Sequence, residues 1–341
     1  MRSPRFSVLM PTHYRPDVIA CAIGSVLDQT EPDFELLVVG DGAAPATAEA
    51  VQSFSDQRIR WLDLPKAPGF GYANRNIALR QARGELIAFA ADDDLMLPDH
   101  LALHGAALAN PTKLWSYSQA LWVSQDGVAA PDLTNLDFAD ERRSFSEVGN
   151  TICGGSFVYR ATALRDRAAW GEDLPGAGDW RIMLQLLAHG TVALARLPTP
   201  TLIHFAAARK TGRHSESPLL SRWLDVADHS AWWPAELRFR SDSYPSLQEA
   251  CLQSMRGDPG FVPGLRKAAT DVVSRLALEC LDGPTRQLAV QPNAQLEEAH
   301  RELAALAAAH AAEISAFRQS TSWRLTAPLR ALRQWLKRPR P

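Results

Sequence analysis

Residues 83–99 read RGELIAFAADDDLMLPD, an apolar run followed at once by three consecutive aspartates. The run from Glu85 to Ala90 is short and apolar and follows a glycine, which is typical of a buried strand in a parallel sheet. In open parallel sheets the carboxyl ends of the strands line the crevice in which ligands bind. The segment therefore predicts a buried strand that carries acidic side chains into a binding site.

The residues around this segment alternate short apolar runs with stretches of helical periodicity. This alternation is typical of βαβ units that build a parallel sheet. The pattern predicts strands over residues 6–10, 34–39, 58–62 and 85–90, helices over 18–27 and 72–82, and a third helix beginning near Pro98.

The following part, residues 114–205, is a mixture that predicts strands over 115–123, 152–159, 192–197 and 202–205 and a helix over 179–189. Residues beyond 206 are predicted to be mostly helical. We therefore expect an α/β fold with a mixed sheet, followed by a mostly helical C-terminal extension. The expected divisions are residues 1–110 and 111–215 for the two halves of the α/β domain, 216–290 for a helical extension and 291–341 for a helix or coiled coil with a basic tail.

The composition is ordinary for a globular protein, with 46% hydrophobic residues and a net charge of -2 among 341 residues. Such a balance offers no basic field for nucleic acid, so we expect no nucleic-acid partner. The four cysteines are far apart and form no CxxC pair, which favours reduced thiols and a cytoplasmic protein. The sequence has no secretion signal and no apolar run of about 18 residues.

Acidic residues follow two of the predicted strands. Asp41 comes after the apolar run 36–40, and Asp92, Asp93 and Asp94 come after the run 86–91. Crowded carboxylates raise one another's pKa unless a cation or solvent compensates them. A divalent cation is one compensation, because Mg²⁺ and Mn²⁺ prefer hard oxygen ligands. A solvated turn that caps the next helix is the alternative from these residues alone.

Several motifs resemble, in order and in spacing, the first part of family 2 glycosyltransferases of the GT-A fold. They are SVLMPTHYRP at 7–16, SVLDQT at 25–30, FELLVVGDG at 34–42, ANRN at 73–76, the segment 83–99 and GDW at 178–180. The resemblance implies a Rossmann-like nucleotide-binding domain. It also implies that a sugar is transferred, with inversion, from a nucleotide-diphosphate sugar to a hydroxyl of a glycan or lipid-linked acceptor, in surface polysaccharide synthesis.

The resemblance implies roles for residues at the donor site. Asp41 would bind the nucleotide base, with Pro11 and Thr12 lining the same pocket, and Asp92 would reach the ribose. Arg75, which follows the loop GFG at 69–71, could bind phosphate oxygens because a guanidinium matches them with two hydrogen bonds. A plain surface position on a helix is the alternative for Arg75, and the loop is only a partial dinucleotide fingerprint.

The resemblance also implies a cation and a base. Asp93 would be the principal ligand of Mn²⁺ or Mg²⁺, with Asp94 in support, and the ion would stabilise the departing diphosphate. Asp179 would be the catalytic base that takes the proton of the acceptor hydroxyl. Aspartate is also a common helix N-cap, and Glu172 and Asp173 are the nearest rival bases.

The sequence departs from the family at two places. Residues 40–43 read GDGA where the family commonly has DDGS, and residues 91–94 read ADDD where it commonly has DADD. The first acid of each motif is therefore replaced, at Gly40 and Ala91. This puts the choice of donor in question more than activity, because Asp41 and Asp93 remain.

Three further features stand outside the predicted site. His204 and His214 could touch the diphosphate or the acceptor, but each is more often a plain core or surface histidine. The motif LLSRW at 219–223 is similar to the QxxRW element of processive family members but lacks its glutamine. We therefore expect addition of one or a few sugars.

The end of the chain, residues 320–341, resembles tails of bacterial polysaccharide glycosyltransferases. It combines an apolar face with a cationic one, formed by Leu325, Leu329, Leu332, Trp335 and Leu336 and by Arg324, Arg330, Arg333, Lys337 and Arg338. Such a helix can lie on the inner face of an anionic membrane, or pack on its own domain or on a partner. Residues 293–317 predict a long helix or short coiled coil, which could join two copies.

Two other functions stay open at this point. A nucleotidyltransferase also places metal-binding acids beside a nucleotide, although PTHYR at 11–15 is not the glycine-rich loop that such enzymes normally have. A non-catalytic module that binds a nucleotide sugar or glycan and serves as a scaffold is the second possibility.

Overall fold

The computed structural model describes residues 3–164, 169–172, 174, 176–206 and 218–290, with a few separate positions between 301 and 316. The chain divides after Arg275 into two compact units, and all of the strands lie in the first. The divisions at residues 110, 215 and 290 stay predictions.

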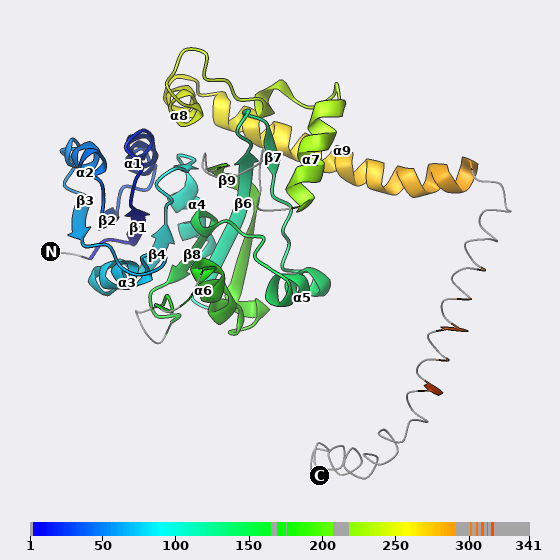
Figure 1. Ribbon diagram of the computed structural model, residues 1–341, viewed down its shortest axis with the longest axis horizontal. Helices are drawn as coiled ribbons and strands as arrows, with labels where there is room; N and C mark the ends of the chain where they lie inside the picture. The colour runs from blue at the N-terminus through cyan, green and yellow to red at the C-terminus, as the bar shows by residue number, and fades with distance from the viewer. Residues whose placement is uncertain are drawn as a thin grey trace, which may run out of the picture. The chain divides into compact units, whose positions relative to one another are not determined.

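A mixed sheet runs through the first unit (Figure 1). Its nine strands among the described residues are β1 (Phe6–Thr12), β2 (Phe34–Asp41), β3 (Ile59–Leu64), β4 (Leu86–Phe89), β5 (Leu95–Met96), β6 (Trp115–Val123), β7 (Ala129–Pro131), β8 (Phe157–Arg160) and β9 (Leu194–Phe205). They are arranged in the order β3-β2-β1-β4-β8-β6-β9-β5, with β7 paired to β6. The first four strands in this order are parallel, whereas β8 is antiparallel to both of its neighbours.

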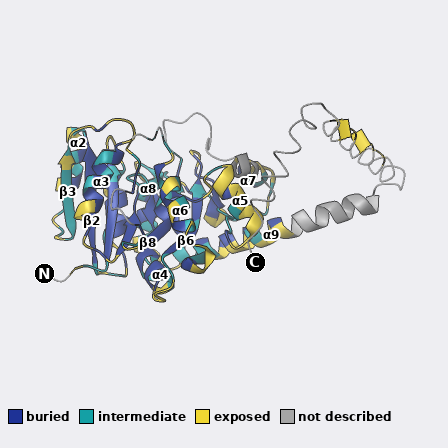
Figure 2. Ribbon diagram, turned by 90° about the horizontal axis from the view of Figure 1, so that it is seen from below, coloured by how far each residue is buried: buried dark blue, intermediate teal, exposed yellow. Residues whose placement is uncertain are grey.

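Helices cover both faces of this sheet. They are α1 (Ile19–Leu27), α2 (Pro45–Gln52), α3 (Tyr72–Gln81), α4 (His100–Ala107), α5 (Ala139–Glu147) and α6 (Gly178–Leu187). Successive residues of β1 face the two layers of helices in turn. Val8 and Met10 pack with residues of α1 and α4, whereas Leu9 points to the other face of the sheet and packs with residues of α3 and α6. In Figure 2 most of the strands are accordingly buried, β3 is of intermediate burial, and the helices are partly exposed. The predicted α/β class with a mixed sheet is confirmed.

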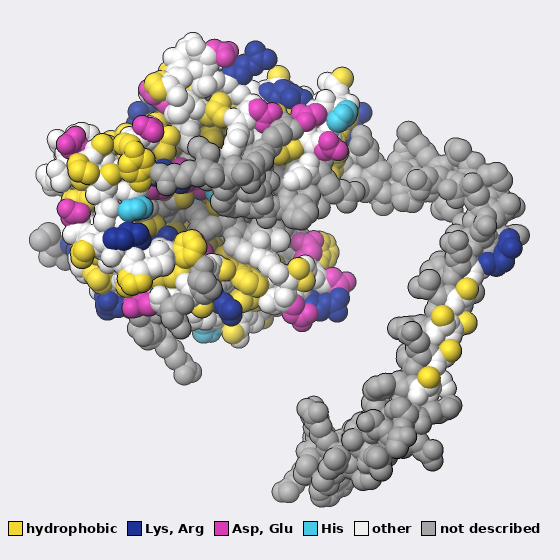
Figure 3. All heavy atoms as spheres, in the orientation of Figure 1, with side chains coloured by type: hydrophobic (Ala, Val, Ile, Leu, Met, Phe, Trp, Pro, Cys, Tyr) yellow, Lys and Arg dark blue, Asp and Glu magenta, His cyan; other side chains and the backbone are white. Residues whose placement is uncertain are grey.

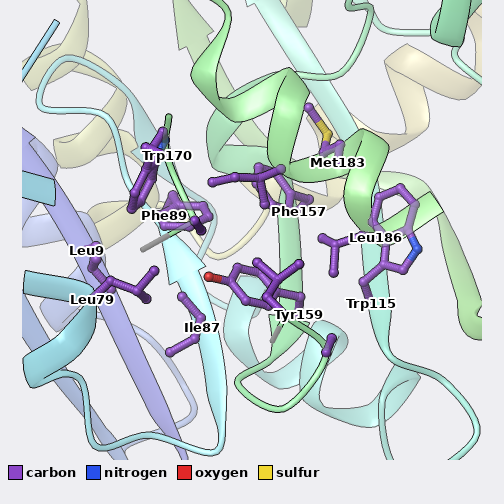
Figure 4. Close-up of a cluster of buried hydrophobic side chains, with 14 of the residues drawn as sticks. Leu9, Leu79, Ile87, Phe89, Trp115, Phe157, Tyr159, Trp170, Met183 and Leu186 are labelled. Atoms are coloured by element: carbon purple, nitrogen blue, oxygen red, sulfur yellow. The ribbon is translucent and has the colours of Figure 1, made fainter. Parts of the chain in front are cut away.

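Aromatic side chains fill the layer between the sheet and α3 and α6 (Figure 4). The ring centroid of Phe89 lies 5.1 Å from that of Phe157 and 5.0 Å from that of Trp170. Burial of each such side chain contributes about 1.5–3 kcal/mol. This packing fixes β4, and with it the starting point of the aspartates that follow.

The sequence pattern was wrong about residues 152–156. They were expected to begin a strand, but Gly154–Ser156 form a turn of 3-10 helix and strand β8 begins only at Phe157. A glycine pair has no preference for extended backbone. The two strands expected at 192–197 and 202–205 are one strand, β9, and strand β5 was not foreseen.

The extension beyond residue 206 contains α7 (Pro218–His229), α8 (Leu247–Gly257) and α9 (Phe261–Val290), as well as a 3-10 turn at Ala235–Leu237. Arg256 of α8 donates to Asp28 at 2.6 Å. Arg266 of α9 forms two hydrogen bonds of 2.7 Å with the carboxylate of Asp99, just before α4. Parallel bonds of this kind are strong and directional, so they hold α8 and the start of α9 on the α/β domain.

The distribution of charged, apolar and cysteine side chains can be followed over the described residues. On the face drawn in Figure 3, acidic and basic side chains of the described residues are interspersed, in keeping with the net charge of -2. Within the described part of the chain, no helix combines the length and the apolar character needed to cross a bilayer. Cys21, Cys153 and Cys251 are buried and free, as expected for reduced thiols.

Candidate active site

A cavity of about 880 Å³ lies where β1, β2 and β4 end. Five of the residues selected from the sequence line it, namely Pro11, Arg75, Asp92, Asp94 and Asp179. Thr12, Asp41 and Asp93 are not among the lining residues. Thr12 and Asp93 each follow a lining residue directly, and Asp41 lies two residues after Val39, which lines the cavity. The cavity is within the range of about 300–1,000 Å³ that small-molecule sites commonly have. The fold thus collects at one sheet edge acids that are far apart in sequence.

Asp41 ends β2 and is held by three donors. Its carboxylate accepts hydrogen bonds from Lys66, from the Ala67 backbone N–H at 2.8 Å and from Asn74 Nδ2 at 2.7 Å. Burial would raise the pKa of Asp41, but these hydrogen bonds bring it below its usual value. Gly71 lies against the carboxylate so closely that a Cβ there would stand 2.5 Å from Oδ2. Asp41 is therefore an ionised, fixed group.

Asp92 and Asp93 share one guanidinium, that of Arg15. The Arg15 Nη2 atom lies 3.2 Å from Oδ2 of Asp93, and Nε lies 3.7 Å from Oδ1 of Asp92. Burial raises the pKa of Asp92, and burial together with the neighbouring carboxylates raises the pKa of Asp93 to about 6. Sequence reasoning missed Arg15, although its place directly after the first strand was a usable signal.

Asp94 faces into the protein. It is 3% exposed, and its carboxylate contacts Nδ1 of His204 at 2.8 Å and accepts the backbone N–H of Phe205 at 3.1 Å. Burial would lower the pKa of His204, but the Asp94 carboxylate raises it well above its usual value. The alternative of a solvated turn is therefore wrong for Asp94, and residues 95–97 are also buried. His204, which the sequence left outside the site, lines the cavity.

Asp179 lies in the first turn of α6, but Ala177 is the N-cap of that helix. The Asp179 carboxylate instead faces the cavity, where Oδ1 accepts the indole N–H of Trp170 at 2.9 Å and lies 3.8 Å from Nη1 of Arg75. A Cβ at Gly154 would stand 2.7 Å from Oδ2. Glycine at that position leaves room beside the second carboxylate oxygen.

The loop before α6 is built tightly around this position. Ala177 adopts a left-handed φ of 57°, and a Cβ on Gly178 would meet the ring of Tyr72 at 2.5 Å. The Tyr72 hydroxyl accepts the backbone N–H of Gly178 at 2.9 Å. These contacts set the direction in which Asp179 leaves the helix.

The remaining candidates lie elsewhere. Glu172 accepts a hydrogen bond from Asn76 at 3.0 Å. Asp173 and His214 lie outside the described residues, and the motif at 219–223 lies on α7. Trp223, the last residue of that motif, lines the cavity together with Trp122, Asp132 and Glu141. The sequence analysis did not predict that these four residues line the cavity.

Comparison with known proteins bears on the predicted resemblance. Residues 7–167 match the model of glycosyl transferase family 2, the family that the motifs resemble. Escherichia coli WfgD, a UDP-Glc:α-D-GlcNAc-diphosphoundecaprenol β-1,3-glucosyltransferase, is 39% identical over 97 residues, which are 28% of this chain and 38% of WfgD. TuaG of Bacillus subtilis (strain 168), assigned to teichuronic acid biosynthesis, is 30% identical over 172 residues, which are 50% of this chain and 65% of TuaG.

The chain thus spans less than two thirds of the length of either relative. Among solved structures, residues 1–349 of Staphylococcus aureus TarS in complex with UDP-GlcNAc superimpose with a TM-score of 0.49 at 22% identity. The superposition covers 62% of this chain and 61% of that chain.

Proposed function

We propose that this protein is an inverting glycosyltransferase that moves a sugar from a nucleotide-diphosphate sugar to a hydroxyl of a glycan or lipid-linked acceptor. The observation that carries the proposal is that Asp179 faces the same cavity as Arg75 and Asp92. A displacement at the anomeric carbon needs a base and diphosphate-binding groups within reach of one sugar, and one cavity brings both kinds of group together. The name of WfgD supports a lipid-linked acceptor, and the assignment of TuaG to teichuronic acid biosynthesis supports a role in surface polysaccharide synthesis.

The donor would lie along the ends of β1, β2 and β4. The ionised Asp41 would accept hydrogen bonds from the base, with Pro11 and Thr12 beside it, and Asp92 would bind the ribose. Arg75 would bind the diphosphate, because it lines the cavity and its guanidinium is backed by the ring of Tyr72 at 5.3 Å.

The acids fit a divalent cation. Asp92 and Asp93 are crowded and have raised pKa values, with Arg15 as the guanidinium in contact with them. Added positive charge would relieve this repulsion, and Mn²⁺ or Mg²⁺ takes such oxygen ligands. Asp93 would be the principal ligand. Asp94, which the resemblance implied in support, contacts His204 instead. The bound ion would supply positive charge to the departing diphosphate.

The residues of the chain would carry out the proton transfer. The acceptor hydroxyl oxygen bonds to the anomeric carbon while the bond from that carbon to the phosphate oxygen breaks on the opposite face. Asp179 takes the hydroxyl proton, later lost to solvent, and the nucleoside diphosphate leaves with the bonding electrons. The Trp170 indole, at 2.9 Å from Oδ1, holds the carboxylate so that Oδ2 is directed to the acceptor.

The acceptor would contact the part of the cavity lining that the donor leaves free. That lining includes the indoles of Trp122 and Trp223 and the carboxyl groups of Asp132 and Glu141. Indole faces suit the apolar faces of sugar rings, and carboxylates accept hydrogen bonds from sugar hydroxyls. We expect one or a few sugars to be added.

The proposal is tested by separating donor binding from transfer. Asp179→Asn should keep Mn²⁺-dependent nucleotide binding in calorimetry and lower the transfer rate by about 10²–10⁴-fold, the usual worth of a positioned base. Asp93→Ala should lose the Mn²⁺-dependent binding. Glu172→Gln, which alters the rival base, should transfer normally.

Equal turnover by wild type and Asp179→Asn would remove Asp179 as the base. The donor itself can be found by thermal shift with UDP-, GDP-, dTDP- and CMP-sugars with and without Mn²⁺, since a ligand that binds the native state raises its stability.

A further inference from the structure

Asp94, Cys153 and His204 meet at one point of the cavity wall although they are far apart in sequence. Strand β5 pairs with β9 so that Leu95 lies opposite Ile203, which places positions 94 and 204 at the next register step. Cys153 precedes the 3-10 turn at Gly154–Ser156, which connects to β8 in the same sheet. All three side chains line the cavity.

The three donor atoms are spaced as ligands of a single ion would be. The His204 Nδ1 and Asp94 Oδ2 atoms are 2.8 Å apart, the Cys153 Sγ atom is 3.8 Å from the same oxygen, and all three lie within 4.8 Å of one another. Zinc binds such ligands at about 2.0–2.3 Å, which separates them by roughly 3–4 Å. Small side-chain shifts would therefore suffice.

The surroundings hold this cluster in place. The Phe205 backbone N–H donates to Asp94 Oδ1 at 3.1 Å, and the Trp122 ring packs edge-on against His204 with centroids 4.6 Å apart. Asp94 and Cys153 are 3% and 7% exposed. Supporting contacts of this kind orient metal ligands and raise affinity.

The ligand types differ from those of the neighbouring acids. Asp92 and Asp93 offer oxygen, which suits Mg²⁺ and Mn²⁺, whereas a thiol with an imidazole selects softer ions such as Zn²⁺. We propose that Asp94, Cys153 and His204 form a binding site for Zn²⁺ or a similar thiophilic cation, with a fourth coordination position open to the cavity. The ion replaces the thiol proton of Cys153 and the proton on Nδ1 of His204, and both protons pass to solvent.

An ion at this position would lie beside the proposed donor pocket. Resting on the proposed function, this part of the inference predicts that Zn²⁺ inhibits transfer and that Cys153→Ser relieves the inhibition. Binding itself does not depend on that function, and the two can fail separately.

Co²⁺ titration of the full chain, without nucleotide or acceptor, tests the site directly. Bound Co²⁺ should give a thiolate-to-cobalt charge-transfer band and intense visible bands of four-coordinate Co²⁺. Added Zn²⁺ should abolish both, whereas an excess of Mg²⁺ should not. Cys153→Ser should lose the charge-transfer band and weaken Zn²⁺ binding by more than about tenfold, since the loss of a mere supporting contact already costs roughly that much.

Cys251→Ser is the matched control, because Cys251 is also buried and free but lies on α8. It should keep the full spectrum. If Cys153→Ser does not fold, His204→Gln should show the same loss of the band. A wild-type protein without the band, a band that persists in Cys153→Ser, or displacement of Co²⁺ by Mg²⁺ would each overturn the proposal.

Discussion

Arg75 and Asp179 are in contact in the lining of the cavity, with Nη1 of Arg75 3.8 Å from Oδ1 of Asp179. One comes from α3 and the other from α6, so the group proposed to bind diphosphate and the group proposed as base are positioned together. A charged ligand that recruits the guanidinium would therefore also change the surroundings of the carboxylate.

Arg75→Gln should weaken binding of a nucleoside diphosphate by roughly 10- to 100-fold, because hydrogen bonds to charged groups are worth about 1.5–3 kcal/mol. Calorimetric titration measures this loss. Arg80→Gln, at an exposed position on the same helix, is the control and should bind normally. Unchanged affinity in Arg75→Gln would mean that the guanidinium serves structure alone.

Glu35 should make stability depend on pH. Its side chain is 3% exposed and ion-paired with Arg60 and Arg83, while Ser7 donates to it at 2.7 Å. Burial acts to raise the pKa of Glu35, but the hydrogen bonds from Ser7 and the arginines bring it below the ordinary value of 4.5. The contribution of Glu35 to the free energy of unfolding is therefore complete above pH 4.5. It is lost as the pH falls through the lowered pKa of Glu35 in the folded protein.

Glu35→Gln should therefore lower the free energy of unfolding by about 2–3 kcal/mol at neutral pH. This difference from wild type should become smaller at acid pH. Urea unfolding at neutral and acid pH measures both values. Asp271→Asn, which breaks the exposed pair with Lys267, is the control and should unfold at the same urea concentration as wild type. A stability difference between wild type and Glu35→Gln that becomes larger as the pH falls would contradict the predicted pH dependence.

Gly40 replaces a family acid, and the structure indicates why restoring that acid should fail. A Cβ at Gly40 would lie 2.6 Å from the ring of Trp61. Gly40→Asp should therefore lose about 1–3 kcal/mol of stability, the usual cost of overpacking, and should gain no nucleotide affinity.

Gly257→Ala, at a site where a Cβ meets nothing within 4 Å, serves as the control for adding a side chain at glycine. The double variant Gly40→Asp with Trp61→Ala should recover part of the stability lost in Gly40→Asp, because the two residues share one space. Additive losses would show that Trp61 is not the cause.

The tail at residues 320–341 lies outside the described residues, and its membrane role stays a prediction from the sequence. Wild type should float with anionic liposomes in a density gradient, and deletion of these residues should reduce flotation, because their cationic and apolar side chains are removed together. Neutral liposomes are the control and should carry less protein. Flotation that survives the deletion would refute the idea.

Much of the fold was readable from residues 6–90, because buried parallel strands are apolar runs separated by helical periodicity. The same pattern placed Asp41 and Asp92 at strand ends, and the ordered motifs predicted the family whose model matches residues 7–167. Beyond residue 110 the hydrophobic pattern predicted strands and helices less well. Short or irregular elements such as β5 and the turn at Gly154–Ser156 lack a distinctive period.

Tertiary structure alone decided which acids meet which partners. Asp94 turned to His204 and Cys153, whereas the adjacent Asp93 turned to Arg15. Neighbouring residues at the end of a strand point to opposite sides. His204 is more than a hundred residues away from Asp94 in the sequence and is brought close to it only by strand order and register. Sequence determined the kinds of group available to this site, and the pairing of β5 with β9 determined their arrangement.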